Sequence, residues 1–152
     1  MTTSTKSIED IDGRCNCLAA RQASRYLTAA YDRALSPVGL RATQFSILHK
    51  LASAGPLTIG ELAKIIAMDR TTLSTNLKPL ERDGLLEIRT GEDRRAREAH
   101  ITNAGVKRYH QAFPMWTAVQ DEFESSYGMR DAAALRKSLR SVLETGFAPW
   151  DE

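Results

Sequence analysis

The sequence lacks the features that mark membrane, secreted and disulfide-stapled proteins. None of its apolar runs approaches the ~20 residues needed to cross a bilayer. The first residues are mostly polar and contain no apolar core of the kind found in a secretory signal. Only two cysteines occur among 152 residues, which is too few for a disulfide framework. We therefore expect a cytoplasmic protein with no membrane partner, in which residues 1–13 form a disordered lead-in.

Residues with catalytic or metal-binding chemistry are also sparse. The three histidines are dispersed, and no Cys, His and carboxylate cluster has the spacing of metal ligands. The sequence contains no glycine-rich phosphate loop and no Gly-x-Ser-x-Gly nucleophile turn. These absences predict a protein that is not an enzyme and that needs no metal and no cofactor.

The two cysteines, Cys15 and Cys17, are separated by one residue. If both lie on a helix, their side chains point ~200° apart and cannot form a disulfide with each other. Their small number and this spacing fit a protein of a reducing compartment.

Charge of either sign is nearly balanced, at a net +2, but it is unevenly distributed. Residues 112–152 carry four Lys and Arg against seven Asp and Glu, whereas residues 1–111 carry seventeen against twelve. An excess of positive charge in one part of a chain is a modest electrostatic signal for a nucleic-acid partner.

The most informative segment is residues 69–84, which the spacing of its residues predicts to be a helix. Its apolar residues fall at i, i+4 and i+7 and share one side: Leu73, Leu77 and Leu80. The opposite side carries hydroxyls and cations: Thr71, Thr75, Lys78 and Arg82. Such a face can enter a DNA major groove and contact base edges and phosphates together.

A basic hairpin follows this helix directly. Residues 85–89 and 98–101 are short predicted strands, and residues 91–94 supply the turn between them. The hairpin carries three arginines, Arg94, Arg95 and Arg97. A helix with a basic hairpin beside it is the layout of a winged helix-turn-helix, which we expect to span residues 43–101.

Three further helices precede the wing. The first is predicted over residues 14–37, and the second begins at a Thr43 cap and ends at residues 55–56. A third helix opens at Thr58, which forms a capping box with Glu61. Leu57 is expected to join the small sheet, and Asp69 to cap the groove-binding helix.

Two helices follow the wing. A long one begins at Thr102, and Pro114 is expected to kink or break it because proline lacks the N–H of the helical ladder. The last is predicted from about residue 130 to 145. The amphipathic helices in 14–37 and 102–147 lie outside the winged helix-turn-helix of residues 43–101. They need a partner to bury their apolar faces. The fold class is therefore mainly α with a small β wing, and these helices predict a homodimer.

At this point the chain resembles the MarR family of bacterial transcription factors. The resemblance rests on residues 30–35, 40–48, 57–63, 69–73 and 80–85, and on the wing signature at 93–95 with Ile-Thr-Asn-Ala-Gly at 101–105. It implies a homodimer that binds a pseudo-palindromic operator in double-stranded DNA, most often as a repressor. It also implies a response to a small molecule or an oxidant.

The resemblance implies roles for individual residues. Arg95 would enter the minor groove, Asp93 would orient the wing, and Asp69 would pair with Arg95. The residues expected to contact bases and phosphates or to carry the wing are Arg70, Thr71, Thr75, Lys78, Asp93, Arg94, Arg95 and Arg97.

Two mechanisms of release from the operator follow from the residues and the resemblance. The first is a small aromatic ligand, such as a carboxylate or a phenol, in a pocket lined by Arg21, Tyr26, Tyr31, Phe45 and His49. The second is oxidation of Cys17, whose spacing to Tyr31 is similar to that of the organic-hydroperoxide-sensing (OhrR-like) branch. Fourteen helical residues span ~21 Å, so contact between Cys17 and Tyr31 requires the partner subunit.

A reading from another functional class is a helical protein-interaction module that does not bind DNA. The arginines at the tip of the wing favour DNA instead, and a steep salt dependence of duplex binding distinguishes the two.

Overall fold

The structure is a computed structural model that describes residues 11–149. Most of the expected disordered lead-in, residues 1–10, lies outside the described residues. Residues 11–14 are helical, so the expectation of disorder up to residue 13 is wrong for its last three residues. Within the described part, no helix is both long enough and apolar enough to span a membrane.

The chain is mostly helical with one small sheet, which confirms the expected fold class. The elements before the wing are α2 (Asn16–Leu35), η1 (Ser36–Val38), α3 (Ala42–Ala54), β1 (Leu57–Thr58), α4 (Ile59–Ile66) and α5 (Arg70–Arg82). The wing and the helices after it are β2 (Leu86–Thr90), β3 (Arg97–Ile101), α6 (Asn103–Tyr127), α7 (Met129–Ser141) and η2 (Val142–Glu144).

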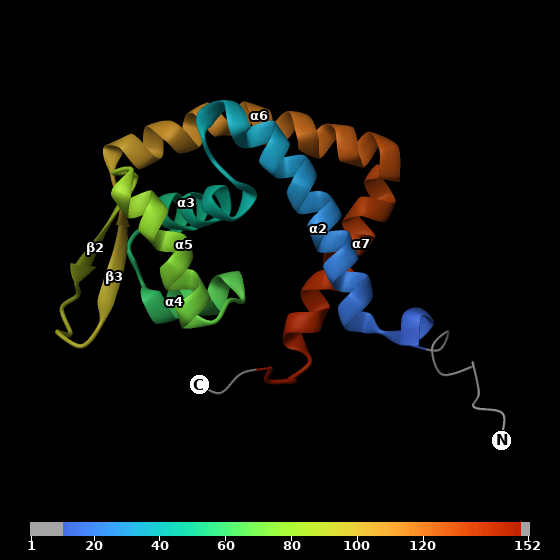
Figure 1. Cartoon of the computed structure of the whole chain (residues 1–152), viewed down its shortest axis with the longest axis horizontal. Coiled ribbons are helices and arrows are strands. Elements are labelled where there is room, and N and C mark those ends of the chain that lie inside the picture. The colour runs from blue at the N-terminus through green and yellow to red at the C-terminus, as the bar shows by residue number, and fades with distance from the viewer. Residues whose placement is uncertain (1–10, 150–152) are drawn as a thin grey trace, which may run out of the picture.

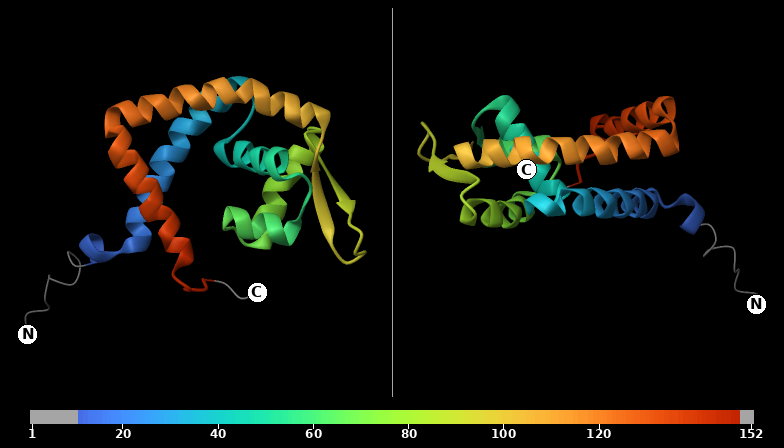
Figure 2. Two further views of the ribbon diagram at one scale, coloured as in Figure 1. Left: turned by 180° about the vertical axis from the view of Figure 1, so that it is seen from behind. Right: turned by 90° about the horizontal axis from the view of Figure 1, so that it is seen from above.

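The long helix α6 runs from the hairpin at one end of the molecule to α7 at the other (Figure 1). Helices α3, α4 and α5 and the hairpin β2–β3 lie under its N-terminal half, and α7 turns back from its C-terminal end. Seen from above, α2 and α7 lie on opposite sides of α6 (Figure 2). The elements of the expected winged helix-turn-helix thus gather at one end, and the candidate dimerisation helices extend from the other.

The sheet has the strand order β1-β3-β2, and both pairings are antiparallel. Leu57 of β1 pairs with Ala99 of β3, which also pairs with Ile88 of β2. The expected pairing of Leu57 into a small sheet is therefore confirmed. This third strand attaches the hairpin to the start of α4.

Local capping signals predicted three helix starts correctly. Thr58 and Glu61 form the expected capping box of α4, in which the Thr58 Oγ1 accepts from the Glu61 N–H at 3.1 Å. Asp69 caps α5 and Thr102 caps α6. These starts were predictable because each cap accepts a hydrogen bond from the residue three positions further along the chain.

The expected Thr43 cap of the second helix is wrong. Helix α3 begins one residue earlier, at Ala42, after Arg41 as its N-cap. The Ala42 N–H donates to the Asp32 carboxylate at 2.7 Å, from near the end of α2. This helix start is therefore held partly by a residue ten positions away and partly by Gln44, whose side chain accepts from the Arg41 N–H at 2.9 Å.

The expected break at Pro114 is also wrong, because α6 runs without interruption from Asn103 to Tyr127. The proline removes one hydrogen bond, to the carbonyl of His110. Both residues are exposed, so water can replace the missing N–H. Pro79 is likewise contained in α5, which continues to Arg82.

The hydrophobic core joins α3, α4, α5 and the sheet to helix α6. The three leucines predicted to face inward on α5, Leu73, Leu77 and Leu80, are all buried. The same core includes Ala112 of α6, and the Phe45 ring stacks against the Trp116 ring at a centroid distance of 6.1 Å. The domain boundary placed at residue 101 stays a prediction, since the core itself continues across it.

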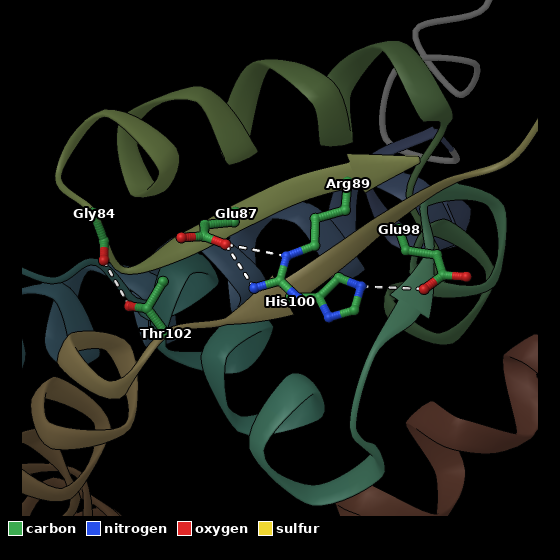
Figure 3. Close-up of polar contacts among 6 residues, drawn as sticks. All are labelled: Gly84, Glu87, Arg89, Glu98, His100 and Thr102. Atoms are coloured by element: carbon green, nitrogen blue, oxygen red, sulfur yellow. Dashed lines mark hydrogen bonds and ion pairs between the residues drawn. The ribbon is translucent and has the colours of Figure 1, made fainter. Parts of the chain in front are cut away.

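The start of α6 fits closely against the loop between α5 and β2. The Thr102 Oγ1 donates to the Gly84 carbonyl at 2.6 Å (Figure 3), and the Thr102 N–H donates to the Leu85 carbonyl at 3.1 Å. One turn later, Gly105 is buried, and a Cβ at this position would collide with the same Leu85 carbonyl. The glycine therefore allows the helix to approach the loop backbone.

We expect Gly105→Ala to destabilise the fold by about 1–3 kcal/mol, because the added methyl group meets a fixed backbone atom rather than a mobile side chain. Urea unfolding measures this free energy. Gly13→Ala is the matched control, since a Cβ at Gly13 meets nothing within 4 Å. Equal stability of the two variants would contradict the close approach.

Candidate nucleic-acid interface

The first turn of α5 is built by Asp69. Its carboxylate accepts from the Thr72 N–H at 2.9 Å and from the Thr72 Oγ1 at 2.6 Å, so the helix begins at Arg70. The expected ion pair between Asp69 and Arg95 is not among the ion pairs recorded for residues 11–149. The carboxylate is instead used as a cap, which orients α5 without a link to the wing.

The same two hydrogen bonds, the side-chain one first, hold the pKa of Asp69 below its ordinary value of 3.8. They favour the charged form of the carboxylate, because an ionised oxygen accepts hydrogen bonds more strongly. A lowered pKa in the folded state means that the carboxylate stabilises the fold above its ordinary pKa. This contribution is lost as the pH falls through the lowered value.

Asp69→Asn tests whether the charge of Asp69 makes stability depend on pH, because asparagine keeps a capping oxygen but carries no titrating charge. The wild type should be the more stable protein near neutral pH, and the difference should shrink as the pH falls below 3.8. Urea unfolding at about pH 7 and about pH 3 measures it. A difference that does not change with pH would show that the charge has no part in the cap.

The outer face of α5 is exposed, as its pattern predicts. Arg70, Thr71, Thr75 and Lys78 all lie on the surface. The Thr75 hydroxyl donates to the Thr71 carbonyl at 3.1 Å within the helix, so its oxygen remains as an acceptor. Arg82, on the same face, forms a 3.5 Å ion pair with the adjacent Asp83.

Asp93 shapes the tip of the wing. Its carboxylate accepts from the Arg95 N–H at 3.1 Å, and its carbonyl accepts from the Ala96 N–H at 2.8 Å. The Gly91 N–H closes the hairpin by donating to the Ala96 carbonyl at 2.8 Å. Asp93 therefore holds the turn through backbone contacts, and the side chains of Arg94, Arg95 and Arg97 are exposed.

Both carboxylates on the wing strands, Glu87 and Glu98, have a partner on the same strand. Arg89 bonds to Glu87 at 2.8 Å, and His100 lies 3.1 Å from Glu98 (Figure 3). Glu87 stands opposite His100 in the register, and Arg89 stands opposite Glu98. In the described part of the chain, no ion pair involves the three arginines at the tip. The carboxylates of the strands thus leave the cations of the tip available.

A cleft separates α5 from the wing, and the start of α4 forms its third wall. It gathers five of the residues predicted from the sequence to contact DNA: Arg70, Lys78, Asp93, Arg95 and Arg97. The other predicted residues, Thr71, Thr75 and Arg94, are exposed but do not line it. The cleft brings four cations together with two carboxylates, those of Asp93 and Glu81.

The cleft also contains residues that the sequence reasoning missed. Ser74 lies four residues after Arg70 and four before Lys78, so helical spacing alone could have placed it on this face. Thr58, Ile59 and Gly60 carry no comparable signal. They reach the cleft only because α4 packs beside α5.

The residues predicted to line a ligand pocket are not gathered in either of two cavities found within residues 11–149, so this pocket stays a prediction. Phe45 is buried in the core, the Tyr31 hydroxyl donates to Gln120, and His49 Nδ1 lies 2.9 Å from the Tyr109 hydroxyl. Arg21 and Tyr26 are exposed on α2. The cleft described above contains none of the five, and neither does a shallow hollow lined by Pro37, Val38, Gly39, Arg108, Gln111 and Met115.

The cysteines lie at the start of α2. Cys15 is the N-cap, with an extended backbone, and its Sγ accepts from the Leu18 N–H at 3.3 Å. Cys17 lies inside the first turn and is exposed. The helical argument does not apply to Cys15, because that residue stands outside the helix, but both thiols are free, as expected. Over residues 11–149, no group of three His, Cys, Asp or Glu could hold a metal ion.

This arrangement of a capped helix beside a basic hairpin defines a winged helix-turn-helix protein. The sequence profile of the MarR family matches residues 38–96. The transcriptional regulator MosR of M. tuberculosis, in a crystal structure with DNA, is 39% identical, with 85% of this chain and 98% of that chain covered and a TM-score of 0.72. The chain belongs to the MarR family and is a DNA-binding transcriptional regulator rather than an enzyme.

Two more distant solved structures share the fold. A mutant of MarR from E. coli, complexed with operator DNA, is 21% identical, with 88% of this chain and 97% of that chain covered and a TM-score of 0.77. BpsR of Bordetella bronchiseptica, whose DNA binding is regulated by 6-hydroxynicotinic acid, is 20% identical, with 85% and 93% covered and a TM-score of 0.75.

Proposed function

We propose that the protein is a homodimeric repressor that binds a pseudo-palindromic operator. Each subunit inserts the exposed face of α5 into a major groove and the tip of its wing into the adjoining minor groove. The observation that carries this proposal is the cleft in which Arg70, Lys78, Arg95 and Arg97 converge from α5 and the wing. A duplex backbone offers the phosphates that such a set of cations neutralises.

The homodimer is supported by the helices that lie outside the reader. Helix α2 has twenty residues and buries only Leu35, and α7 buries only Ala132. Large apolar side chains are exposed near the C-terminal end, among them Met129, Val142, Leu143 and Phe147. Exposed apolar surface of this kind favours association, and a second copy related by a two-fold axis would cover it on both subunits.

The proposed effector is a small aromatic ligand that releases the dimer from its operator. Arg21 and Tyr26 remain exposed on α2, so they would line a pocket only together with the partner subunit. The regulation of BpsR by 6-hydroxynicotinic acid supports this class of ligand. The ligand would act by binding more tightly to a dimer whose two reading heads are misaligned with successive grooves.

The operator contact is testable with Arg95→Ala. Selection of bound duplexes from a random pool would first supply the half-site and its spacing, which should form an inverted repeat about one helical turn apart. On that duplex, Arg95→Ala should weaken binding by about 1–3 kcal/mol. Fluorescence anisotropy over a range of salt concentrations measures the loss and its electrostatic part.

Arg33→Ala is the matched control, because Arg33 is exposed on α2 and does not line the cleft between α5 and the wing. Operator binding by Arg95→Ala that equals that of the control would remove the wing contact from the proposal. A protein that binds no duplex even at low salt would favour the protein-interaction module instead.

A thiol-based oxidant sensor on the same scaffold is the alternative, and the exposure of Cys17 in the first turn of α2 favours it. If Cys17 is the sensor, a hydroperoxide releases the wild type from the operator, whereas Cys17→Ser stays bound. Operator binding before and after treatment, with Cys15→Ser as the control, measures this. Equal responses of wild type and Cys17→Ser would leave the ligand mechanism as the remaining one.

A further inference from the structure

Gly60 lines the cleft, and its backbone conformation does not require a glycine. It is the second residue of α4, and it is absent from the positions that have a positive φ. A helical glycine costs conformational entropy that an alanine would avoid. The reason for a glycine here must therefore lie in what approaches it.

The group that approaches is the guanidinium of Arg70, from the first turn of α5. A Cβ built on Gly60 would lie 3.0 Å from Arg70 Nη2, 3.5 Å from Cζ and 3.8 Å from Nε. These are the three nearest atoms, and all belong to one side chain. The guanidinium thus packs along the backbone of α4 at the point where any other residue would have a side chain.

This contact is a close approach by the end of a long, exposed side chain. No hydrogen bond or ion pair of the Arg70 side chain is recorded within residues 11–149, so packing against Gly60 is its specific restraint. The restraint leaves Arg70 in the wall of the cleft that also contains Lys78 and Arg95. A side chain that is already placed loses less rotamer freedom when it binds.

Electrostatics argues against a purely structural role for the contact. The first turn of a helix presents N–H groups with partial positive charge, and here a cation packs against that turn. The carboxylates adjacent in the sequence, Glu61 beside Gly60 and Asp69 beside Arg70, both act as caps: Glu61 accepts from the Thr58 N–H at 2.8 Å, and Asp69 accepts from the Thr72 N–H at 2.9 Å. A guanidinium beside a helix N-terminus is favourable once an anion such as a DNA phosphate lies between or beside them.

We propose that Gly60 is a positioning residue of the DNA interface: the absence of its side chain lets the Arg70 guanidinium lie against α4 and face the phosphate backbone. The inference rests on the DNA contact of Arg70 in the proposed function. It assigns to α4 a part in operator binding that requires no contact between Gly60 and DNA.

A double-mutant cycle on the intact dimer tests this, with Gly60→Ala, Arg70→Ala and the double variant measured on the selected operator. We expect Arg70→Ala to weaken binding about tenfold and to reduce the slope of log Kd against log salt by about one. Gly60→Ala should weaken binding several-fold in the wild type and should have no further effect when Arg70 is already alanine.

Stability supplies the second measurement. Gly60→Ala should unfold at the same temperature as the wild type or a higher one, because alanine favours helix and the group it displaces is flexible. A lower unfolding temperature would assign Gly60 to packing and overturn the inference. Gly13→Ala is the control for a glycine substitution with nothing within 4 Å, and it should bind the operator as the wild type does.

The remaining outcomes distinguish a failure of this inference about Gly60 from a failure of the proposed contact between Arg70 and DNA. If Arg70→Ala loses affinity but Gly60→Ala does not, or if Gly60→Ala loses as much in both backgrounds, the positioning role of Gly60 is wrong and the contact of Arg70 stands. If Arg70→Ala binds as the wild type does, the proposed contact of Arg70 is wrong and the inference fails with it.

Discussion

The approach of α6 to the backbone at Leu85 is the constraint on which the reading geometry depends. Thr102 ends the wing and begins α6, and its backbone and side chain both bond to the loop that follows α5. The hydrogen bonds of this one residue therefore connect the sheet, the loop after α5 and the start of α6. A change in the packing of α6 at its far end would reach the wing and α5 together, as the proposed effector, bound among the proposed dimerisation helices, requires.

The candidate interface is positively charged because of which charges are paired within the protein and which are not. Along the strands of the wing, Glu87 and Glu98 have partners on the same strand, Arg89 and His100. At the tip, Asp93 bonds to backbone N–H groups rather than to a guanidinium. A small net charge is therefore compatible with a cationic surface, because the carboxylates of Glu87, Glu98 and Asp93 close to that surface already have partners within the protein. Composition alone understates such an interface.

The sequence predicts those parts of the molecule whose causes are local. The leucines of α5 recur at helical spacing, and Thr58, Asp69 and Thr102 cap helices with residues close by in the chain, so pattern was enough. The start of α3 was missed because Asp32 reaches it from another helix. The hydrogen-bond partners of Tyr31 and His49 were missed for the same reason, since both partners lie on α6.

Gly60 and Gly105 show why a glycine in a helix has no single meaning in a sequence. Neither has a positive φ, and both are approached closely by an atom from another element. At Gly105 that atom is a backbone carbonyl, which cannot move without disturbing the junction of α5 and β2. At Gly60 it is the end of an arginine, which can move at little cost to folding. The mobility of the neighbour therefore decides whether the glycine serves the fold or the interface.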